Sequence, residues 1–376
     1  MKYMGSKRAM LGNGLGELLG REVTHARRFV DLFAGSGAVA VHVAQRFAIP
    51  VLAFDLQRYS AILAGAVIAR QSIIKWKPTF EAWQKRAESL FKAYDVPSAD
   101  CLTVKLVTQL RSWCEAQVEL PITTAYGGHY FSPRQAVWID AFRATLPKTE
   151  SSRTVALAAL IQASSQCAAA PGHTAQPFQP TRTAKRFLSE AWCKDIVGRT
   201  RTVFEIIADQ HAQRVGRAQV ADANDAAQQL KDCDLAFIDP PYSGVHYSRF
   251  YHVLETIADG NCGEVSGTGR YPTRIRRPRS RFSVGSESAD ALDGLLSAVS
   301  SRGARAIVTF PDHDCSNGLS GDSVREIAAR HFHVYEQGVE SKFSTLGGTS
   351  DQGRPGEGGR SARRLAKELI LVLKPK

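Results

Sequence analysis

The sequence predicts an α/β protein whose parallel sheet is interrupted by a helical insertion, and three observations support this prediction. Residues 27–76 alternate in the order strand, glycine turn, helix, strand, helix. From about residue 77 to 205 the alternation gives way to mainly helical segments and loops. Short apolar runs then return from residue 217 onward. A chain of 376 residues can bury a core and still hold a sizeable insertion.

The expected elements follow in order along the chain. FVDLF at 29–33 is a β-type apolar run, and AVAVHVAQRF at 38–47 continues as a helix after the turn AGSG. IPVLAFD at 49–55 predicts a second strand that ends on an acid, followed by a helix over 60–76. Later strands are expected within 233–242, 305–314, 332–340 and 367–375. We therefore assign residues 1–76 and 206–376 to the core and residues 77–205 to an inserted, mainly helical domain.

Basic residues outnumber acidic ones, with a formal net charge of +12 and a pI near 9.5. This excess favours a polyanionic partner, nucleic acid before membrane. The segment RYPTRIRRPRSR at 270–281 holds six arginines and no acid. Guanidinium groups suit phosphate oxygens. Phosphate contacts are therefore expected from Arg274, Arg276, Arg277, Arg279 and Arg281.

The seven cysteines are dispersed, with no CxxC pair and no spacing typical of a metal site. This pattern predicts reduced thiols, with neither a disulfide framework nor a bound metal. The opening MKYMGSKRAML lacks the long apolar core of a signal peptide, and no apolar run approaches the roughly 20 residues that span a bilayer. We expect a soluble, cytoplasmic protein with no membrane partner.

The turn DLFAGSG at 31–37 lies between a strand and a helix, where α/β proteins commonly bind nucleotides. Gly35 and Gly37 let the backbone approach a ligand, and the helix start offers N–H groups. Asp55, which ends the next strand, is placed to accept hydrogen bonds from ribose hydroxyls. Ligand binding explains this combination better than a plain strand-to-helix turn does.

Two ligand classes are compatible with the glycine turn. Ala40 stands where a dinucleotide fingerprint tolerates alanine, so the turn by itself leaves a nicotinamide oxidoreductase open. Asp31 argues against that class, because a carboxylate disfavours a pyrophosphate. The same carboxylate suits S-adenosylmethionine, which carries a sulfonium and an ammonium.

The segment LAFIDPPY at 235–242 places a carboxylate and two prolines at the end of an apolar run. Pro240 and Pro241 remove two N–H donors, which leaves the Asp239 carboxylate and the Pro240 carbonyl as acceptors. Two acceptors beside the Tyr242 ring suit an exocyclic NH2 group on a planar base. Such an amine can attack a sulfonium methyl in line, with catalysis mainly by positioning and electrostatics. A base in duplex DNA would have to be flipped out to reach this pocket.

KYMGSK at 2–7, FAGSG at 33–37 and DPPY at 239–242, in this order, resemble the Dam-like adenine-N6 DNA methyltransferases. The resemblance covers residues 1–70 and 217–376. It implies a Rossmann-like, S-adenosylmethionine-dependent methyltransferase core with an inserted target-recognition domain. It also implies that Lys7 lies near the methionine carboxylate, Asp55 at the ribose and Asp222 at the adenine amino group. Together with Asp31, the expected cofactor-binding residues are Tyr3, Gly5, Lys7, Phe33, Gly35, Gly37, Asp55 and Asp222.

The aromatic segment VHYSRFYHVLE at 245–255 follows DPPY directly and allows two interpretations. Tyr247, Tyr251 and Glu255 would share one face of a helix. This face, with Arg249, could cover a flipped base or contact DNA, or it could pack on the protein. The loop AYGGHYF at 125–131 could likewise read base edges.

These features predict an enzyme that methylates an exocyclic amine of a base in DNA, with Asp239, Pro240, Pro241 and Tyr242 as the catalytic residues, and the resemblance implies that this amine is N6 of adenine. Cytosine N4 remains an alternative target, and RNA an alternative substrate. A non-catalytic nucleic-acid-binding protein of the same fold is disfavoured, because it would be expected to lose Asp239 or the glycine turn. Any cognate restriction enzyme is expected on a separate chain.

Overall fold

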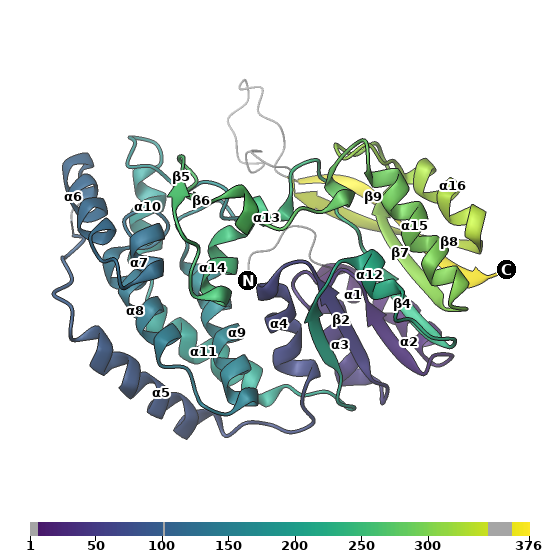
Figure 1. The fold of residues 1–376 in the computed structure, drawn as a ribbon, viewed down its shortest axis with the longest axis horizontal. Helices are drawn as coiled ribbons and strands as arrows, with labels where there is room; N and C mark the ends of the chain where they lie inside the picture. The colour runs from purple at the N-terminus through teal and green to yellow at the C-terminus, as the bar shows by residue number, and fades with distance from the viewer. Residues whose placement is uncertain (1–6, 101, 345–362) are drawn as a thin grey trace. The chain divides into compact units, whose positions relative to one another are not determined.

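The computed structural model describes residues 7–100, 102–344 and 363–376, with side chains outside 338–367 (Figure 1). The expected contacts of Tyr3 and Gly5 therefore lie outside the described residues. Contacts between Cα atoms divide the chain into two compact units. We call residues 57–218 and 247–279 the helical unit, and the described parts of 7–56, 219–246 and 280–376 the sheet unit.

The central sheet has seven strands in the order β3-β2-β1-β4-β7-β9-β8. Pairs β1/β2, β1/β4 and β4/β7 are parallel, whereas β7/β9 and β8/β9 are antiparallel. The strands are β1 (Arg28–Asp31), β2 (Val51–Asp55), β3 (Arg217–Val220), β4 (Asp234–Ile238), β7 (Arg305–Pro311), β8 (Phe332–Ser344) and β9 (Arg363–Pro375). The expected parallel sheet is thus confirmed as mostly parallel, with an antiparallel edge formed by its last two strands.

The sheet unit contains six α-helices within the residues described, with α15 and α16 beside β7 in Figure 1. They are α1 (Arg8–Leu11), α2 (Leu15–Val23), α3 (Ala38–Arg46), α12 (Ala223–Ala227), α15 (Ser288–Ser301) and α16 (Gly321–His331), with the short 3-10 helix η2 at Arg281–Ser283. Strand β4 reads DLAFI and is buried at all five positions. A continuous apolar run is the pattern expected of a parallel strand covered on both faces.

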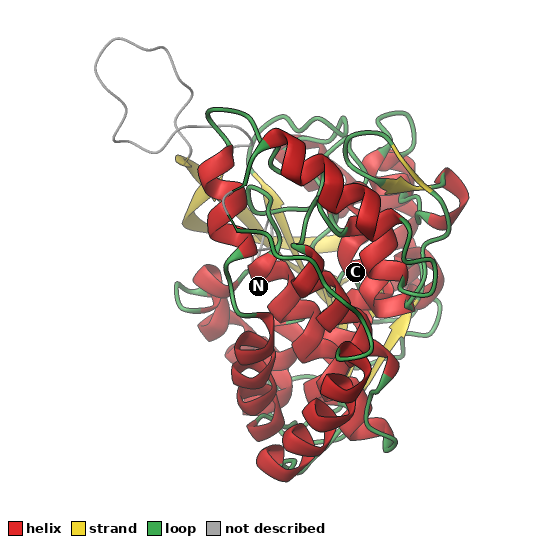
Figure 2. Cartoon of the chain, turned by 90° about the vertical axis from the view of Figure 1, so that its left-hand side faces the viewer, coloured by secondary structure: helices red, strands yellow, loops and turns green. Residues whose placement is uncertain are grey.

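The helical unit contains the remaining described helices and a two-stranded antiparallel sheet; Figure 2 draws all helices of the chain in red and all strands in yellow. Its helices are α4 (Arg58–Ile68), α5 (Trp76–Phe91), α6 (Val104–Glu115), α7 (Pro121–Tyr126), α8 (Pro133–Ala144), α9 (Glu150–Cys167), α10 (Lys185–Trp192), α11 (Ile196–Asp209), α13 (Tyr247–Phe250) and α14 (His252–Asp259). Strands β5 (Val265–Ser266) and β6 (Tyr271–Pro272) precede the 3-10 helix η1 (Arg274–Arg276).

An aromatic cluster of four rings holds three helices of the helical unit together. Phe80 and Trp83 of α5 contact Phe142 of α8 and Phe204 of α11, with ring centroids 4.7 to 6.2 Å apart. Rings of this size dominate the burial of apolar surface in a core. The indole Nε1–H of Trp83 donates to the Phe142 carbonyl at 3.0 Å, so the buried polar atom is paired.

The unit boundaries differ from those expected at residues 77 and 205. Helix α4 and residues 247–279 group with the helices rather than with the sheet. The helix expected over 60–76 ends at Ile68, and a new helix begins at Trp76. Whether the helical unit is a target-recognition domain stays a prediction. In the described parts of the chain, no helix is long and apolar enough to cross a membrane.

Candidate active site

The carboxyl ends of β1 and β4 lie side by side in the sheet unit. These strands are parallel neighbours, with Asp31 opposite Phe237, and the Leu32 N–H donates to the Phe237 carbonyl at 3.0 Å. The glycine turn after β1 and DPPY after β4 therefore start from the same edge of the sheet. Open α/β sheets bind ligands at this edge.

The glycine turn is fastened to β2 by Asp55. Gly35 and Gly37 have φ of 51° and 75°, a region that favours glycine. The Gly35 N–H donates to Oδ2 of Asp55 at 2.8 Å, and the Ala34 N–H donates to the Phe54 carbonyl at 2.9 Å. Asp55 thus has a structural partner in the turn, and its expected contact with a ribose stays a prediction.

Asp31 is buried beneath the turn. It accepts hydrogen bonds from the backbone N–H groups of Phe33, at 3.2 Å, and of Ala40. Burial raises the pKa of this carboxyl to about 8, and the nearby carboxylates of Asp239 and Asp55 also raise it against the lowering effect of the backbone donors. A pKa of about 8 favours the protonated form of Asp31 at neutral pH in the ligand-free chain.

Two further expected cofactor residues have partners within the sheet unit. The Phe33 ring meets the Phe282 ring edge-on, with centroids 5.0 Å apart. Asp222 caps α12, accepting a hydrogen bond from the Asn224 N–H at 2.9 Å. These contacts fix both side chains near the carboxyl edge of the sheet.

Among the described residues, two side chains hold Asp239 by its Oδ1 atom. Oδ1 is 2.8 Å from the Lys7 ammonium and accepts a hydrogen bond from the Thr309 hydroxyl at 2.9 Å. The Asp239 side chain is 20% exposed, Pro240 is buried, and Tyr242 packs partly buried against the core. The second carboxylate oxygen and the Pro240 carbonyl are the acceptors that the sequence pattern offers to an amine.

The DPPY turn is braced by the loop that precedes α16. The fully buried Asn317 donates through Nδ2 to the Pro241 carbonyl at 2.8 Å and to the Phe282 carbonyl at 3.0 Å. The Gly244 N–H donates to the Ser316 hydroxyl at 3.0 Å. These bonds pair the Pro241 carbonyl and the Gly244 N–H and so fix the path of the chain after Asp239.

Lys7 lies between two carboxylates. Its ammonium is 2.8 Å from Oδ1 of Asp239 and 2.8 Å from Oε1 of Glu368 on β9. The resemblance had implied a ligand carboxylate as its partner, and that contact stays a prediction. Among the described residues of the site, the carboxylates of Asp55, Asp239 and Glu368 outnumber the ammonium of Lys7, so the site suits a sulfonium or ammonium group rather than a pyrophosphate.

Two of the expected DNA-contacting arginines stack on one tyrosine of the helical unit. The guanidiniums of Arg249 and Arg277 lie 4.6 and 5.5 Å from the centroid of the Tyr271 ring. The ring is fixed by its hydroxyl, which donates to the Ala175 carbonyl at 2.6 Å. Arg274 and Arg276 are exposed on η1.

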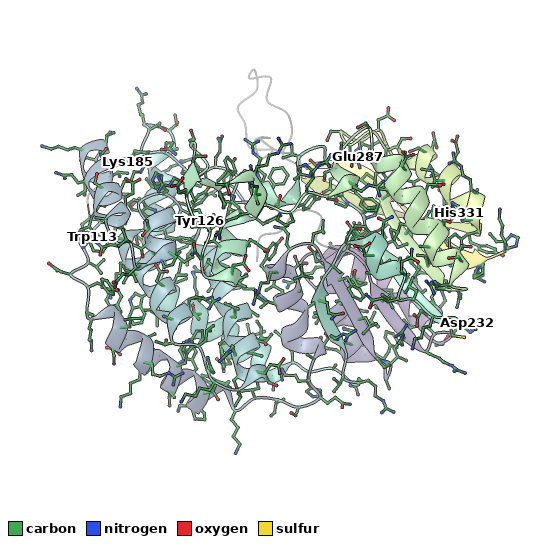
Figure 3. All side chains as sticks on the ribbon, viewed as in Figure 1. Trp113, Tyr126, Lys185, Asp232, Glu287 and His331 are labelled. Carbon is green, nitrogen blue, oxygen red and sulfur yellow. The ribbon has the colours of Figure 1, made fainter. Side chains whose placement is uncertain are left out.

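Arg281, the last of the expected arginines, lies near a carboxylate instead of stacking on a ring. Arg281 belongs to the sheet unit, where its Nε lies 3.9 Å from Oε2 of Glu287, the residue labelled in Figure 3. Arg279 is exposed in the helical unit.

The aromatic residues after DPPY serve mainly to pack the helical unit. The helix expected over 247–255 is interrupted at Tyr251, which is buried, as is His252. Glu255 accepts hydrogen bonds from the N–H groups of Arg58 at 2.8 Å and Tyr59 at 3.1 Å, so it caps α4. The packing interpretation thus holds for Tyr251 and His252.

The loop at 125–131 does not offer its aromatic rings to a base. Tyr126, labelled in Figure 3, and Tyr130 and Phe131 are fully buried. The Tyr126 hydroxyl is 2.8 Å from the Thr256 hydroxyl, and the Tyr130 hydroxyl donates to the Gly269 carbonyl at 2.9 Å. The expectation of base reading by these rings is wrong, because they form the core that positions residues 269–271.

Three residues at the candidate site were missed by sequence reasoning: Thr309, Asn317 and Glu368. Thr309 and Glu368 lie within apolar strands, where the only signal is a polar residue in an otherwise buried run. In the described part of the chain, His, Cys, Asp and Glu form no group of three or more that could hold a metal.

Residues 3–112 match the sequence model of the D12 class N6 adenine-specific DNA methyltransferases. The matched segment contains Tyr3 to Lys7 of the opening motif, the glycine turn and Asp55, whereas DPPY lies beyond it. The resemblance inferred from the motifs is confirmed by this match.

Three related proteins match longer stretches of this chain than the family model does. The modification methylase LlaI of Lactococcus lactis subsp. lactis is 23% identical over 353 residues, which are 89% of this chain and 51% of that protein. The type II methyltransferase M.FokI of Planomicrobium okeanokoites is 28% identical over 72% of this chain and 39% of its own length. M.NlaIII of Neisseria lactamica is 27% identical over 69% of both proteins. The chain thus spans about half or less of the first two relatives.

Proposed function

We propose that this chain, which shares its glycine-turn segment with the D12 class N6 adenine-specific DNA methyltransferases, methylates the N6 amine of adenine in duplex DNA. S-adenosylmethionine would supply the methyl group as a sulfonium. We propose a short specific target sequence and a role in modification, with any cognate nuclease on a separate chain. We further propose a cytoplasmic location.

The observation that supports this proposal best is the adjacency of the two motifs. Asp31 ends β1, Asp239 follows β4, and the two strands are parallel neighbours. The electrostatic influence of Asp239 on the pKa of Asp31 indicates that the two carboxyl groups are close. A methyl donor at the glycine turn and an amine at DPPY would therefore meet at one edge of the sheet.

In the proposed reaction, Asp239 and the Pro240 carbonyl accept hydrogen bonds from the target amine. Bound S-adenosylmethionine would supply an electrophilic methyl carbon and take back the electrons of the S–C bond as a neutral thioether, while the two acceptors would direct the lone pair of the amine at that carbon. The nitrogen then releases one proton to water through the Asp239 carboxylate. Pro241 keeps the turn rigid, and Tyr242 would stack on the base.

The contacts of Asp239 support different roles for its two carboxylate oxygens. Lys7 and Thr309 both bond to Oδ1, which fixes the carboxylate plane. Oδ2 would then accept the hydrogen bond from the target amine. Tyr247 and the arginines Arg249, Arg274, Arg276, Arg277, Arg279 and Arg281 are proposed to contact the DNA backbone around the flipped base.

The test is the transfer of labelled methyl groups from S-adenosylmethionine to duplex DNA by the wild type and by Asp239→Ala. We expect the substitution to reduce the rate by about a hundredfold or more, because it removes an acceptor that acts on the reacting amine. Binding of S-adenosylmethionine, measured by calorimetry, should change little. The matched control is Asp232→Ala, since Asp232 is exposed before β4 and is labelled in Figure 3.

Mass spectrometry of the digested product identifies the base. N6-methyladenine is the expected product, whereas N4-methylcytosine would establish the cytosine alternative, which the same pair of acceptors could serve. Methyl transfer to RNA alone would overturn the DNA assignment. NADH binding without S-adenosylmethionine binding would favour the oxidoreductase.

A further inference from the structure

The strongest unassigned feature of the candidate site is the carboxylate of Glu368. Its side chain is 4% exposed and its Oε1 lies 2.8 Å from the ammonium of Lys7, which is 7% exposed. The same ammonium lies 2.8 Å from Oδ1 of Asp239. One buried cation is therefore shared by two carboxylates, one on β9 and one in the turn after β4.

The sheet topology brings Glu368 to this position. Strand β9 lies between β7 and β8 and pairs Glu368 with Pro311, at the carboxyl end of β7. Strand β7 is in turn the parallel neighbour of β4, which leads into Asp239. The antiparallel direction of β9 is what places the start of its buried run, rather than its end, at the ligand-binding edge.

The pKa values of Lys7 and Asp239 are both raised, but by different causes. Burial alone would lower the pKa of Lys7, but the two carboxylates raise it above its ordinary value, so the ammonium stays charged. For Asp239, burial raises the pKa, Lys7 lowers it, and Glu368 raises it again. Burying a second carboxylate carries a large desolvation penalty, which a shared ammonium compensates only in part.

We propose that Glu368 is a positioning residue for methyl transfer, which holds Lys7 at Oδ1 of Asp239 and keeps the net charge of the Lys7–Asp239–Glu368 cluster at −1. This inference rests on the proposed function. Glu368 touches neither the amine nor the methyl group and acts through Lys7. The shared ammonium anchors one oxygen of Asp239 without neutralising the carboxylate, so the other oxygen stays a strong acceptor while positive charge grows on the amine.

The first test needs no activity. Selective ¹³C labelling of aspartate carboxyl groups, with Asp239→Asn to assign the signal, reports the titration of Asp239 in the ligand-free protein. In Glu368→Gln, Asp239 loses a neighbouring negative charge and keeps Lys7, so its titration should move to lower pH. An unchanged titration would overturn the proposal.

The second test is the rate of a single turnover at saturating S-adenosylmethionine and DNA. Glu368→Gln should slow methyl transfer by about tenfold to a hundredfold, since the cluster loses the negative charge that favours the developing cation. Its pH–rate profile should follow the lowered titration of Asp239, while the apparent affinity for DNA changes little. The double variant Lys7→Met with Glu368→Gln restores a net charge of −1 and should recover part of the lost rate.

Two controls separate this role from others. Glu336→Gln makes the same change on β8, where Glu336 pairs with Arg325 at 2.8 Å, and should leave the rate and the profile unaltered. Glu368→Asp keeps the charge but shortens the side chain, so it should lie between wild type and Glu368→Gln; it also replaces that variant if the amide fails to fold. A wild-type rate and profile in Glu368→Asp and Glu368→Gln would refute the proposal. Absence of transfer by the wild type would refute the proposed function instead, with the carboxyl titration still deciding the role of Glu368.

Discussion

At the scale of single residues, the candidate site depends on carboxyl groups in unlike surroundings. Asp31 is buried under backbone donors, and Asp55 is bound to the glycine turn. Asp239 is paired with Lys7 and remains partly exposed. Residue type alone does not separate these roles, because the surroundings decide which carboxyl keeps a proton.

Asp31 makes the stability of the ligand-free chain depend on pH. Its pKa is raised to about 8 in the folded protein, so between roughly pH 4 and 8 the folded chain holds a proton that the unfolded chain has released. This contribution is therefore fully present at low pH and is lost as the pH rises through 8. We expect the free energy of unfolding to fall by up to about 1.4 kcal/mol per pH unit in this window from Asp31.

The measurement is urea unfolding of the wild type and of Asp31→Asn between pH 5 and 8. The amide does not titrate, so the difference in stability between the two proteins should change steadily with pH. A difference that stays constant over this range would show that Asp31 is ionised throughout.

At the scale of elements, buried side chains take over hydrogen bonds that short segments cannot make for themselves. Asp140 on α8 accepts from the N–H groups of Ile122 and Thr123 at 3.0 and 2.8 Å and from the Thr123 hydroxyl at 2.7 Å. It thereby caps the six-residue helix α7 from outside that helix. Asn317 plays a similar part for the DPPY turn.

Replacing Asp140 by alanine should lower the free energy of unfolding by about 2–3 kcal/mol, because it leaves buried N–H donors without an acceptor. Chemical denaturation monitored by circular dichroism gives this quantity. The exposed Asp95 provides the comparison within the same unit, and Asp95→Ala should change stability by less than about 0.5 kcal/mol. Equal effects of the two substitutions would contradict the capping role.

At the scale of the whole molecule, segment 270–281 contributes six positive charges to a net charge of +12. Segment 270–281 is held at its start by the buried contacts of Gly269 and by Arg270, which donates to the Ala125 carbonyl at 2.8 Å. The arginines of η1 are exposed beyond this anchor. A fixed backbone with exposed guanidiniums suits contact with a phosphate chain.

Arg274→Ala and Arg276→Ala should each weaken binding to duplex DNA by a similar factor for all sequences. Each should also reduce the slope of log K against log salt by about 1, because one phosphate contact is lost. Fluorescence anisotropy at several salt concentrations measures both quantities. Arg302→Ala removes an exposed arginine of the sheet unit that contacts Gln228, and its salt slope should match the wild type.

Local chemistry accounts for the parts of the fold that were predicted. Apolar runs located the strands around Phe29 and Phe237, and the glycine turn located the helix that follows the first of them. The break at the buried Tyr251 and the end of α4 at Ile68, where the Arg70 side chain donates to the Ala66 carbonyl, were not predicted, because side-chain contacts of this kind do not show in helical periodicity.

The sequence by itself determined the two motifs, their place after buried strands and the excess of arginine, since each depends on residues close together in the chain. Only the tertiary structure decided that β1 and β4 are neighbours and that Lys7 is shared by Asp239 and Glu368. It also decided that the rings at 126–131 are core. The physical reason is that the pKa of a carboxyl and the partner of a buried ammonium depend on distances between segments hundreds of residues apart, which strand order and direction fix and local sequence does not encode.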